Sequence, residues 1–157
     1  MGQAKNGSGK TGCFALGMLT SVDTSKDCVQ AVSLAPTQEL AYETAETLKK
    51  LGVKTKVRIS PVVGGMTISS KVTDHIVVAT VGKLNDLINK RLIDLSTVRV
   101  FVLDEADEFL KDRISGDVTH IHKQCTAPPQ VLLFSATFMI LQNKGGRGNK
   151  AVSAHVR

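Results

Sequence analysis

The chain of 157 residues alternates short apolar runs with longer segments in which apolar residues recur every three or four positions. Short runs predict buried strands, and the longer spacing predicts helices that turn one face to a core. Strands that alternate with helices predict an α/β fold, a parallel sheet flanked by helices on both faces. The predicted strands cover residues 29–35, 54–63, 75–79, 98–103 and 130–134. The predicted helices cover residues 11–19, 40–51, a stretch after Thr80 that includes 84–88, and 115–125.

Local residue types mark where some of these elements begin and end. Pro36 closes the first strand, and Thr37 suits the N-cap of the next helix because its hydroxyl can accept from a backbone N–H group. Gly52 follows the last apolar position of that helix, where glycine commonly ends helices. Thr80 is expected to cap the helix that follows the strand at 75–79.

Polar residues close each apolar run at its carboxyl end. In a parallel sheet these ends lie along one edge, where ligands of such folds bind. The sequence therefore predicts a functional edge that collects Pro36-Thr37, Gly64-Gly65, Thr80, Asp104-Glu105 and Ser135-Ala136-Thr137.

The chain opens with the pattern of a phosphate-binding loop. Closely spaced glycines let several backbone N–H groups point into one concavity, and a helix that starts near Lys10 adds its positive end. Lys10 is expected to reach the β/γ-phosphates, and the Thr11 hydroxyl to hold Mg²⁺. A flexible Gly/Ser-rich start with a chance Gly-Lys-Thr is the alternative. The expected nucleotide-binding residues are Ala4, Lys5, Asn6, Gly7, Ser8, Gly9, Lys10 and Thr11, with Ala4 where the strict pattern has glycine.

A carboxylate pair after the strand at 98–103 supplies the second half of the expected site. Asp104 is expected to hold Mg²⁺, partly through water, and Glu105 to orient the attacking water. An ordinary acidic turn is the alternative. It does not explain three acids within residues 104–107 directly after an apolar strand. Two motifs in this order favour a nucleotide site more than either does alone.

Composition narrows the class of protein. The length fits one domain, and no apolar run approaches the ~20 residues of a membrane span. Cys13, Cys28 and Cys125 have no paired spacing, which favours reduced thiols in an intracellular protein, nuclear or cytoplasmic. For His120 and His122 we favour a solvated helix face over a metal site, because no partner ligands lie nearby in the sequence.

Net charge gives little information about a binding face. Four of the six net positive charges lie in residues 142–157, which contain no acid. We expect a domain over residues 1–138 and an atypical basic tail, disordered, over residues 139–157.

The ordered set of motifs resembles the first RecA-like domain of the DEAD-box RNA helicases over roughly residues 3–138. Asp104-Glu105-Ala106-Asp107 is the sequence for which that family is named. The phosphate loop, Gly64-Gly65 and the Ser-Ala-Thr at 135–137 follow in the family's order. Residues 36–41 are similar to its Pro-Thr-Arg-Glu-Leu-Ala, and residues 80–83 to its Thr-Pro-Gly-Arg. Within the family, the sequences of residues 100–104 and 132–134 look like those of the members that act in mRNA export and translation initiation.

The resemblance implies Mg²⁺-dependent ATP hydrolysis coupled to RNA binding and to local strand separation. It implies catalytic roles for Lys10, Asp104, Glu105 and Asp107, and coupling of the ATP and RNA sites by Ser135, Ala136 and Thr137. It also implies contacts with the RNA sugar-phosphate backbone, which glycines and helix N-termini can make without reading bases. The expected RNA-binding residues are Pro36, Thr37, Gln38, Glu39, Gly64, Gly65, Thr80, Gly82 and Lys83.

The chain departs from the family pattern in two kinds of feature. Gln38 and Lys83 stand where the family has arginine, which predicts weaker phosphate contact because the bidentate guanidinium is lost. Only Met1, Gly2 and Gln3 precede the loop, so we expect the family's adenine-reading segment and the strand that leads into the loop to be missing. We also expect the second RecA-like domain to be missing.

Three functions follow from these features. The favoured one is the ATP-binding half of an ATP-dependent RNA helicase, weakly active or inactive alone. The second is a non-hydrolysing fragment that binds RNA or a protein partner. The third is another P-loop ATPase, such as a DNA helicase or translocase, which residues 36–41 argue against.

Overall fold

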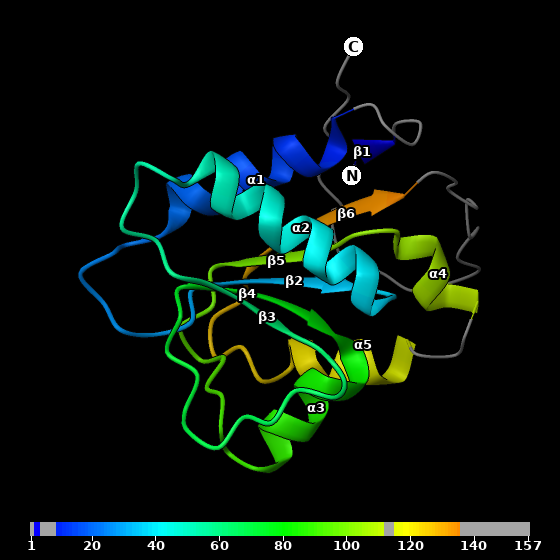
Figure 1. The fold of residues 1–157 in the computed structure, drawn as a ribbon. Helices are drawn as coiled ribbons and strands as arrows, with labels where there is room; N and C mark the ends of the chain where they lie inside the picture. The colour runs from blue at the N-terminus through cyan, green and yellow to red at the C-terminus, as the bar shows by residue number, and fades with distance from the viewer. Residues whose placement is uncertain (1, 4–8, 112–114, 136–157) are drawn as a thin grey trace.

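The computed structural model describes residues 2–3, 9–111 and 115–135. Its six strands form one sheet in the order β1-β6-β5-β2-β4-β3, and every pair of neighbours is parallel (Figure 1). The strands are β1 (Gly2–Gln3), β2 (Ala31–Ala35), β3 (Ile59–Val62), β4 (Ile76–Thr80), β5 (Val100–Leu103) and β6 (Gln130–Ser135). The helices are α1 (Lys10–Ser21), α2 (Gln38–Leu51), α3 (Val81–Asn89), α4 (Ala106–Lys111) and α5 (Ser115–His122).

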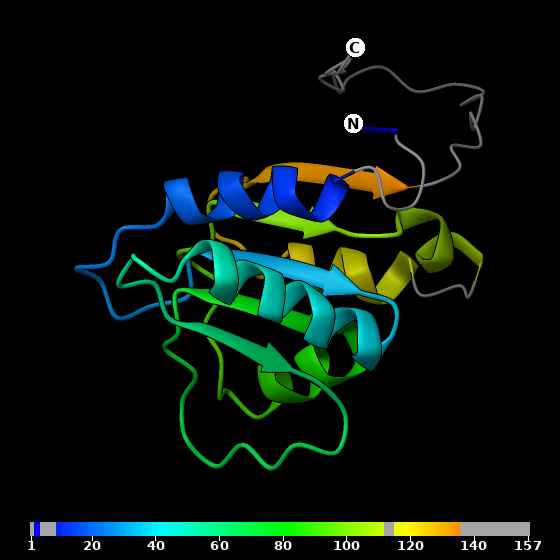
Figure 2. The same ribbon diagram turned by 45° about the horizontal axis from the view of Figure 1, so that its top comes forward.

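Helices cover both faces of this sheet, which confirms the predicted α/β class. α1 and α2 lie along one face, and α3 and α5 along the other (Figures 1 and 2). Alternate residues of the central strands therefore enter opposite cores: Ala31 and Ala35 of β2 pack with α1 and α2, whereas Val32 and Leu34 pack with α3 and α5. Burial on both sides explains why these strands are continuous apolar runs and do not alternate with polar residues.

Several element boundaries differ from the sequence prediction. β3 covers residues 59–62 of the predicted strand 54–63, and as an edge strand it pairs with β4 alone. α4 was not predicted, since six residues are too few to display a helical period. The leading strand was expected to be missing, and this was wrong in part: Gly2–Gln3 pair in parallel with Phe134 and Ser135 of β6.

The two histidines of α5 differ in environment. His120 is exposed, as expected of a solvated helix face. His122 is partly buried, and its ring packs edge-on against Phe101 at 5.5 Å between centroids, so the solvated-face prediction was wrong for this residue. Among the described residues, no three His, Cys, Asp or Glu side chains come together as a metal site. No helix in those ranges has both the length and the apolarity to cross a membrane.

A buried histidine organises the amino edge of the sheet. The His75 side chain is fully buried, and its Nδ1 accepts a hydrogen bond of 3.0 Å from the Arg58 backbone N–H. The His75 carbonyl accepts from the N–H groups of Gln30 and Ala31, at 2.8 and 3.1 Å. Burial lowers the pKa of His75 below 6.5, and the Arg58 charge acts in the same direction, against Asp27 and Asp74.

Replacement of His75 by Asn is expected to flatten the pH dependence of stability. Because the folded pKa is lowered, the stability that neutral His75 contributes is complete above pH 6.5 and is lost as the pH falls through the folded value. Asn retains an acceptor for the Arg58 N–H group without a titrating ring. Urea unfolding at about pH 7.5 and about pH 5.5 measures the difference. The exposed His120→Asn serves as the control, and equal pH dependence in both variants would contradict the assignment.

Candidate nucleotide and nucleic-acid site

The residues of the predicted functional edge that the structure describes lie at or just after the carboxyl ends of the strands. The start of α1 and the turn before α4 both lie at this edge (Figure 2). β5 and β2 occupy the middle of the sheet, with β6 on one side and β4 on the other. The parallel topology thus brings together motifs that are up to about a hundred residues apart in the sequence.

The described part of the phosphate loop has the expected backbone. Gly9 is left-handed with φ of 85°, and α1 begins at the next residue, Lys10. Within residues 2–3, 9–111 and 115–135, no atom lies within 4 Å of where a Gly9 Cβ would be, and the positive φ by itself favours glycine here. The Gly9 carbonyl accepts the first helical bond, from Cys13 at 3.1 Å. Residues 4–8, which include Ala4, Lys5, Asn6, Gly7 and Ser8, lie outside the described ranges.

Asp104 is a buried carboxylate at the centre of this edge. The residue is 4% exposed, and its backbone N–H donates to Leu34 O of β2 at 3.1 Å. Its Oδ1 accepts from the Glu105 N–H at 3.1 Å. Burial raises the pKa of Asp104, and the Glu105 charge adds to the rise, while the Glu105 N–H and the Lys10 charge oppose it. The Lys10 ammonium is therefore within electrostatic reach of Asp104, which links the two predicted motifs.

Glu105 makes the turn from β5 into α4. Its φ is 51°, a left-handed conformation that is uncommon outside glycine. Its carbonyl accepts from the Glu108 N–H at 2.9 Å, which starts the helix directly after the strand. This conformation is the type of local strain that accumulates at functional sites. It lets two consecutive carboxylates, Asp104 and Glu105, occupy the strand end.

A hydrogen bond joins α4 to the end of β6. Ser135, which is 1% exposed, donates from Oγ to Asp107 Oδ1 at 2.5 Å. Of the residues predicted to couple the ATP and RNA sites, Ser135 is described, and it contacts the predicted catalytic residue Asp107. Ala136 and Thr137 lie outside the described ranges.

The three segments predicted to bind RNA also meet. Thr37 caps α2, accepting from the Leu40 N–H at 3.2 Å, and thus places Gln38 in the first turn. A Cβ on Gly64 would lie 2.7 Å from Gln38 Nε2, so the end of the Gln38 side chain lies over this glycine and would have to move to admit a side chain. Lys83 Nζ donates to the Met66 carbonyl at 2.8 Å. Nothing in the sequence pointed to Met66, because it takes part through its backbone carbonyl and not through its side chain.

Much of this surface is exposed and rich in backbone donors. Gly65 has φ of 78°, which favours glycine, and α3 begins directly after Thr80 without a side-chain cap. Thr37 Oγ1 accepts from the Leu40 N–H in the first turn of α2, whereas the first N–H groups of α3 have no side-chain cap. The exposed members of the predicted RNA set are Thr37, Gln38, Glu39, Gly65 and Gly82, and the half-buried ones are Pro36, Gly64, Thr80 and Lys83.

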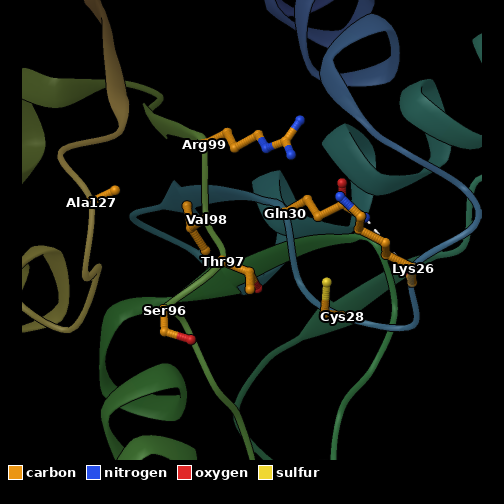
Figure 3. A pocket seen from close by; sticks show the side chains of 8 residues that line it. All are labelled: Lys26, Cys28, Gln30, Ser96, Thr97, Val98, Arg99 and Ala127. Atoms are coloured by element: carbon orange, nitrogen blue, oxygen red, sulfur yellow. Dashed lines mark hydrogen bonds between the residues drawn. The ribbon is translucent and has the colours of Figure 1, made fainter.

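A separate hollow of about 220 Å³ lies at the amino edge of the sheet (Figure 3). Three of its polar side chains, those of Gln30, Thr97 and Lys26, are engaged within the protein. Gln30 Nε2 donates to the Asp23 carbonyl at 2.8 Å, and Thr97 Oγ1 donates to the Val29 carbonyl at 2.8 Å. Lys26 pairs with Asp23 at 3.3 Å. We assign this hollow a structural role. Its lining residues are Lys26, Cys28, Gln30, Ser96, Thr97, Val98, Arg99 and Ala127.

The fold is that of a RecA-like domain, and comparisons with known proteins place it in a family. Residues 1–143 match the model of the DEAD/DEAH box helicases, and the chain belongs to this family. The DEAD-box ATP-dependent RNA helicase CshA of Bacillus cereus is 42% identical over 142 residues, which are 87% of this chain and 27% of CshA. The ATP-dependent RNA helicase me31b of Drosophila melanogaster is 36% identical over 143 residues, 88% of this chain and 31% of the relative.

Solved structures of the family superpose on the same region. Dbp5 of S. cerevisiae, bound to RNA and ADP BeF3, has a TM-score of 0.83 at 34% identity, and the match covers 87% of this chain and 36% of Dbp5. A DEAD box protein from Methanococcus jannaschii gives 0.79 at 35% identity, with 87% and 39% covered. The chain spans about a quarter to a third of the length of the curated relatives it matches.

Replacement of Asp104 by Asn is expected to stabilise the ligand-free chain. Because the folded pKa of Asp104 is raised, the buried charge opposes folding at neutral pH, and the amide removes this cost. The gain in the free energy of unfolding should be present at about pH 7 and should shrink toward about pH 4, where both folded and unfolded states protonate.

Asp94→Asn is the matched control with the opposite sign. The pKa of Asp94 is lowered by hydrogen bonds from Ser96, so loss of its charge should destabilise the fold at neutral pH. Chemical unfolding of both variants measures the two effects. A loss of stability in Asp104→Asn equal to that in Asp94→Asn would contradict the assigned environment of Asp104.

Proposed function

We propose that the chain is the ATP-binding half of an ATP-dependent DEAD-box RNA helicase, which couples Mg²⁺-ATP hydrolysis to RNA binding and local strand separation. The observation that carries the proposal is the geometry of the carboxyl edge, where the buried Asp104 carboxylate directly follows β5 and α1 begins at Lys10 after left-handed Gly9. Family membership and the RNA- and nucleotide-bound state of Dbp5 support it.

Each site residue has a chemically suitable role in this proposal. Lys10 at the N-terminus of α1 would bind the β/γ-phosphates with the helix N–H groups. A desolvated carboxylate such as Asp104 gains most from a nearby cation, so Asp104, through water, and Thr11 fit a Mg²⁺ ion that would neutralise phosphate charge. Glu105 would orient the attacking water. Asp107, bonded to Ser135, would transmit the state of the phosphate site toward the RNA side.

The RNA surface would act through backbone groups. The turn at Gly64 and Gly65 and the uncapped start of α3 at Thr80 offer N–H groups to phosphates. Such contacts carry no base information, so the proposal implies binding that is largely independent of sequence. Gln38, beside Gly64, would contribute a neutral hydrogen bond in place of a charged one.

Efficient turnover would need a second RecA-like domain. Arginine fingers supply roughly 10³–10⁵-fold of the rate in related nucleotide hydrolases, and this domain would receive them from elsewhere. We therefore propose residues 1–138 as the ATP-binding domain, with residues 139–157 as a basic tail. Because the chain spans less than a third of CshA and me31b, a fragment that binds RNA or a partner without hydrolysis is the second candidate.

Lys10→Ala is expected to weaken Mg²⁺-ATP binding by about ten- to a hundredfold, the value of a hydrogen bond to a charged group. Isothermal titration calorimetry of the whole chain measures the change. Lys26→Ala at the amino edge removes the same charge far from the site and should bind as the wild type does. Equal affinity of Lys10→Ala and wild type would contradict the nucleotide site. RNA-stimulated hydrolysis at rates of about 1 s⁻¹ by this chain alone would contradict the need for a second domain.

A further inference from the structure

Lys83 is a basic side chain of the candidate RNA surface, yet its ammonium group faces the protein. Its Nζ donates to the Met66 carbonyl at 2.8 Å and lies 3.5 Å from Asp86 Oδ2. The side chain is only 14% exposed. An ammonium has three N–H donors, so these two partners use most of its capacity. A lysine that serves mainly as a phosphate contact would instead keep its charge in solvent.

The segment that Lys83 contacts is a turn whose shape is set by several separate constraints. Val63 is fully buried, and its carbonyl accepts from the Met66 N–H at 3.4 Å. Gly65 has φ of 78°, and Gln38 lies over Gly64. Lys83 adds a bond from α3, so the turn is held from α2 on one side and from α3 on the other.

Asp86 holds Lys83 in this direction. It lies one helical turn after Lys83 and also pairs with Lys90, at 2.9 Å. The Asp86 carboxylate and the Met66 carbonyl thus both lie within reach of the Lys83 ammonium. Without Asp86 the ammonium would have a weaker preference for the Met66 carbonyl.

We propose that Lys83 is a positioning residue that fixes the turn at residues 64–66 against the first turn of α3. The backbone N–H groups of the two segments then form one continuous surface for RNA phosphates. Lys83 acts by its bond to the Met66 carbonyl, and Asp86 assists it. The proposal rests on the RNA-binding function proposed above, although the bond itself can be tested without RNA.

The test compares Lys83→Gln, Lys83→Arg and Asp86→Asn with Lys90→Gln in the whole chain. Lys90→Gln removes one positive charge from the same helix without a contact to the turn. Amide hydrogen exchange by NMR reports on residues 64–66 in the ligand-free protein. Titration with a single-stranded oligouridine at several salt concentrations gives the affinity and its salt dependence.

We expect exchange of the Met66 amide, which bonds to the Val63 carbonyl, to become about fivefold faster in Lys83→Gln, the effect of one lost hydrogen bond. It should remain near wild type in Lys83→Arg, which can still reach the carbonyl, and in Lys90→Gln. Oligouridine affinity should fall in Lys83→Gln with an unchanged salt slope, and Asp86→Asn should bind no more tightly than wild type.

Two results would overturn the proposal. One is unchanged exchange in Lys83→Gln together with a salt slope smaller by ~0.7, which is the signature of a lost phosphate contact on a single strand. The other is tighter RNA binding by Asp86→Asn, because release of Lys83 would then favour the ligand. If the wild-type chain bound no oligouridine, the proposed function would fail, and the exchange data would still decide the role of Lys83.

Discussion

The burial of one carboxylate, that of Asp104, is the constraint on which the proposed chemistry depends. Its strand, β5, lies in the middle of the sheet, and its N–H bond to Leu34 fixes it against β2. Desolvation at this position opposes ionisation, and the Lys10 charge offsets only part of that cost. A buried negative charge that is compensated only in part would suit the cation proposed above, at some cost in stability.

The two edges of the sheet are used differently. At the amino edge, His75, Gln30 and Thr97 are bonded to neighbouring backbone groups, and these bonds secure the starts of the strands. At the carboxyl edge, α3 begins without a side-chain cap, and Gly65 turns the backbone in a left-handed conformation. Because hydrogen bonds secure the starts of the strands at the amino edge, the fold can tolerate a buried carboxylate and an uncapped helix start at the carboxyl edge.

Sequence reasoning recovered what depends on local pattern. The apolar runs located β2, β4 and β5 because strands buried on both faces leave a strong signal, and an apolar run also located the more exposed β6. Thr37 was correctly assigned as an N-cap, and Gly9 has the backbone expected of a phosphate loop. The order of the motifs was sufficient to identify the family.

The remaining features arise from contacts between distant residues. The bond from Lys83 to Met66 and the packing of Gln38 on Gly64 join segments that no local pattern connects. β1 has two residues, too few for an apolar run, and it exists because β6 offers a partner. The burial of Asp104 likewise depends on the surrounding sheet, so the sequence could indicate its role but not its raised pKa.

The pKa of Asp104 itself tests the central claim most directly. Carbon-13 NMR of the labelled carboxyl groups can follow its titration in the free chain and with Mg²⁺ and ATP. We predict a pKa above 3.8 in the free chain and a fall when Mg²⁺-ATP binds, because the cation favours the ionised form. A value at or below 3.8 in the free chain, unchanged by Mg²⁺-ATP, would contradict it.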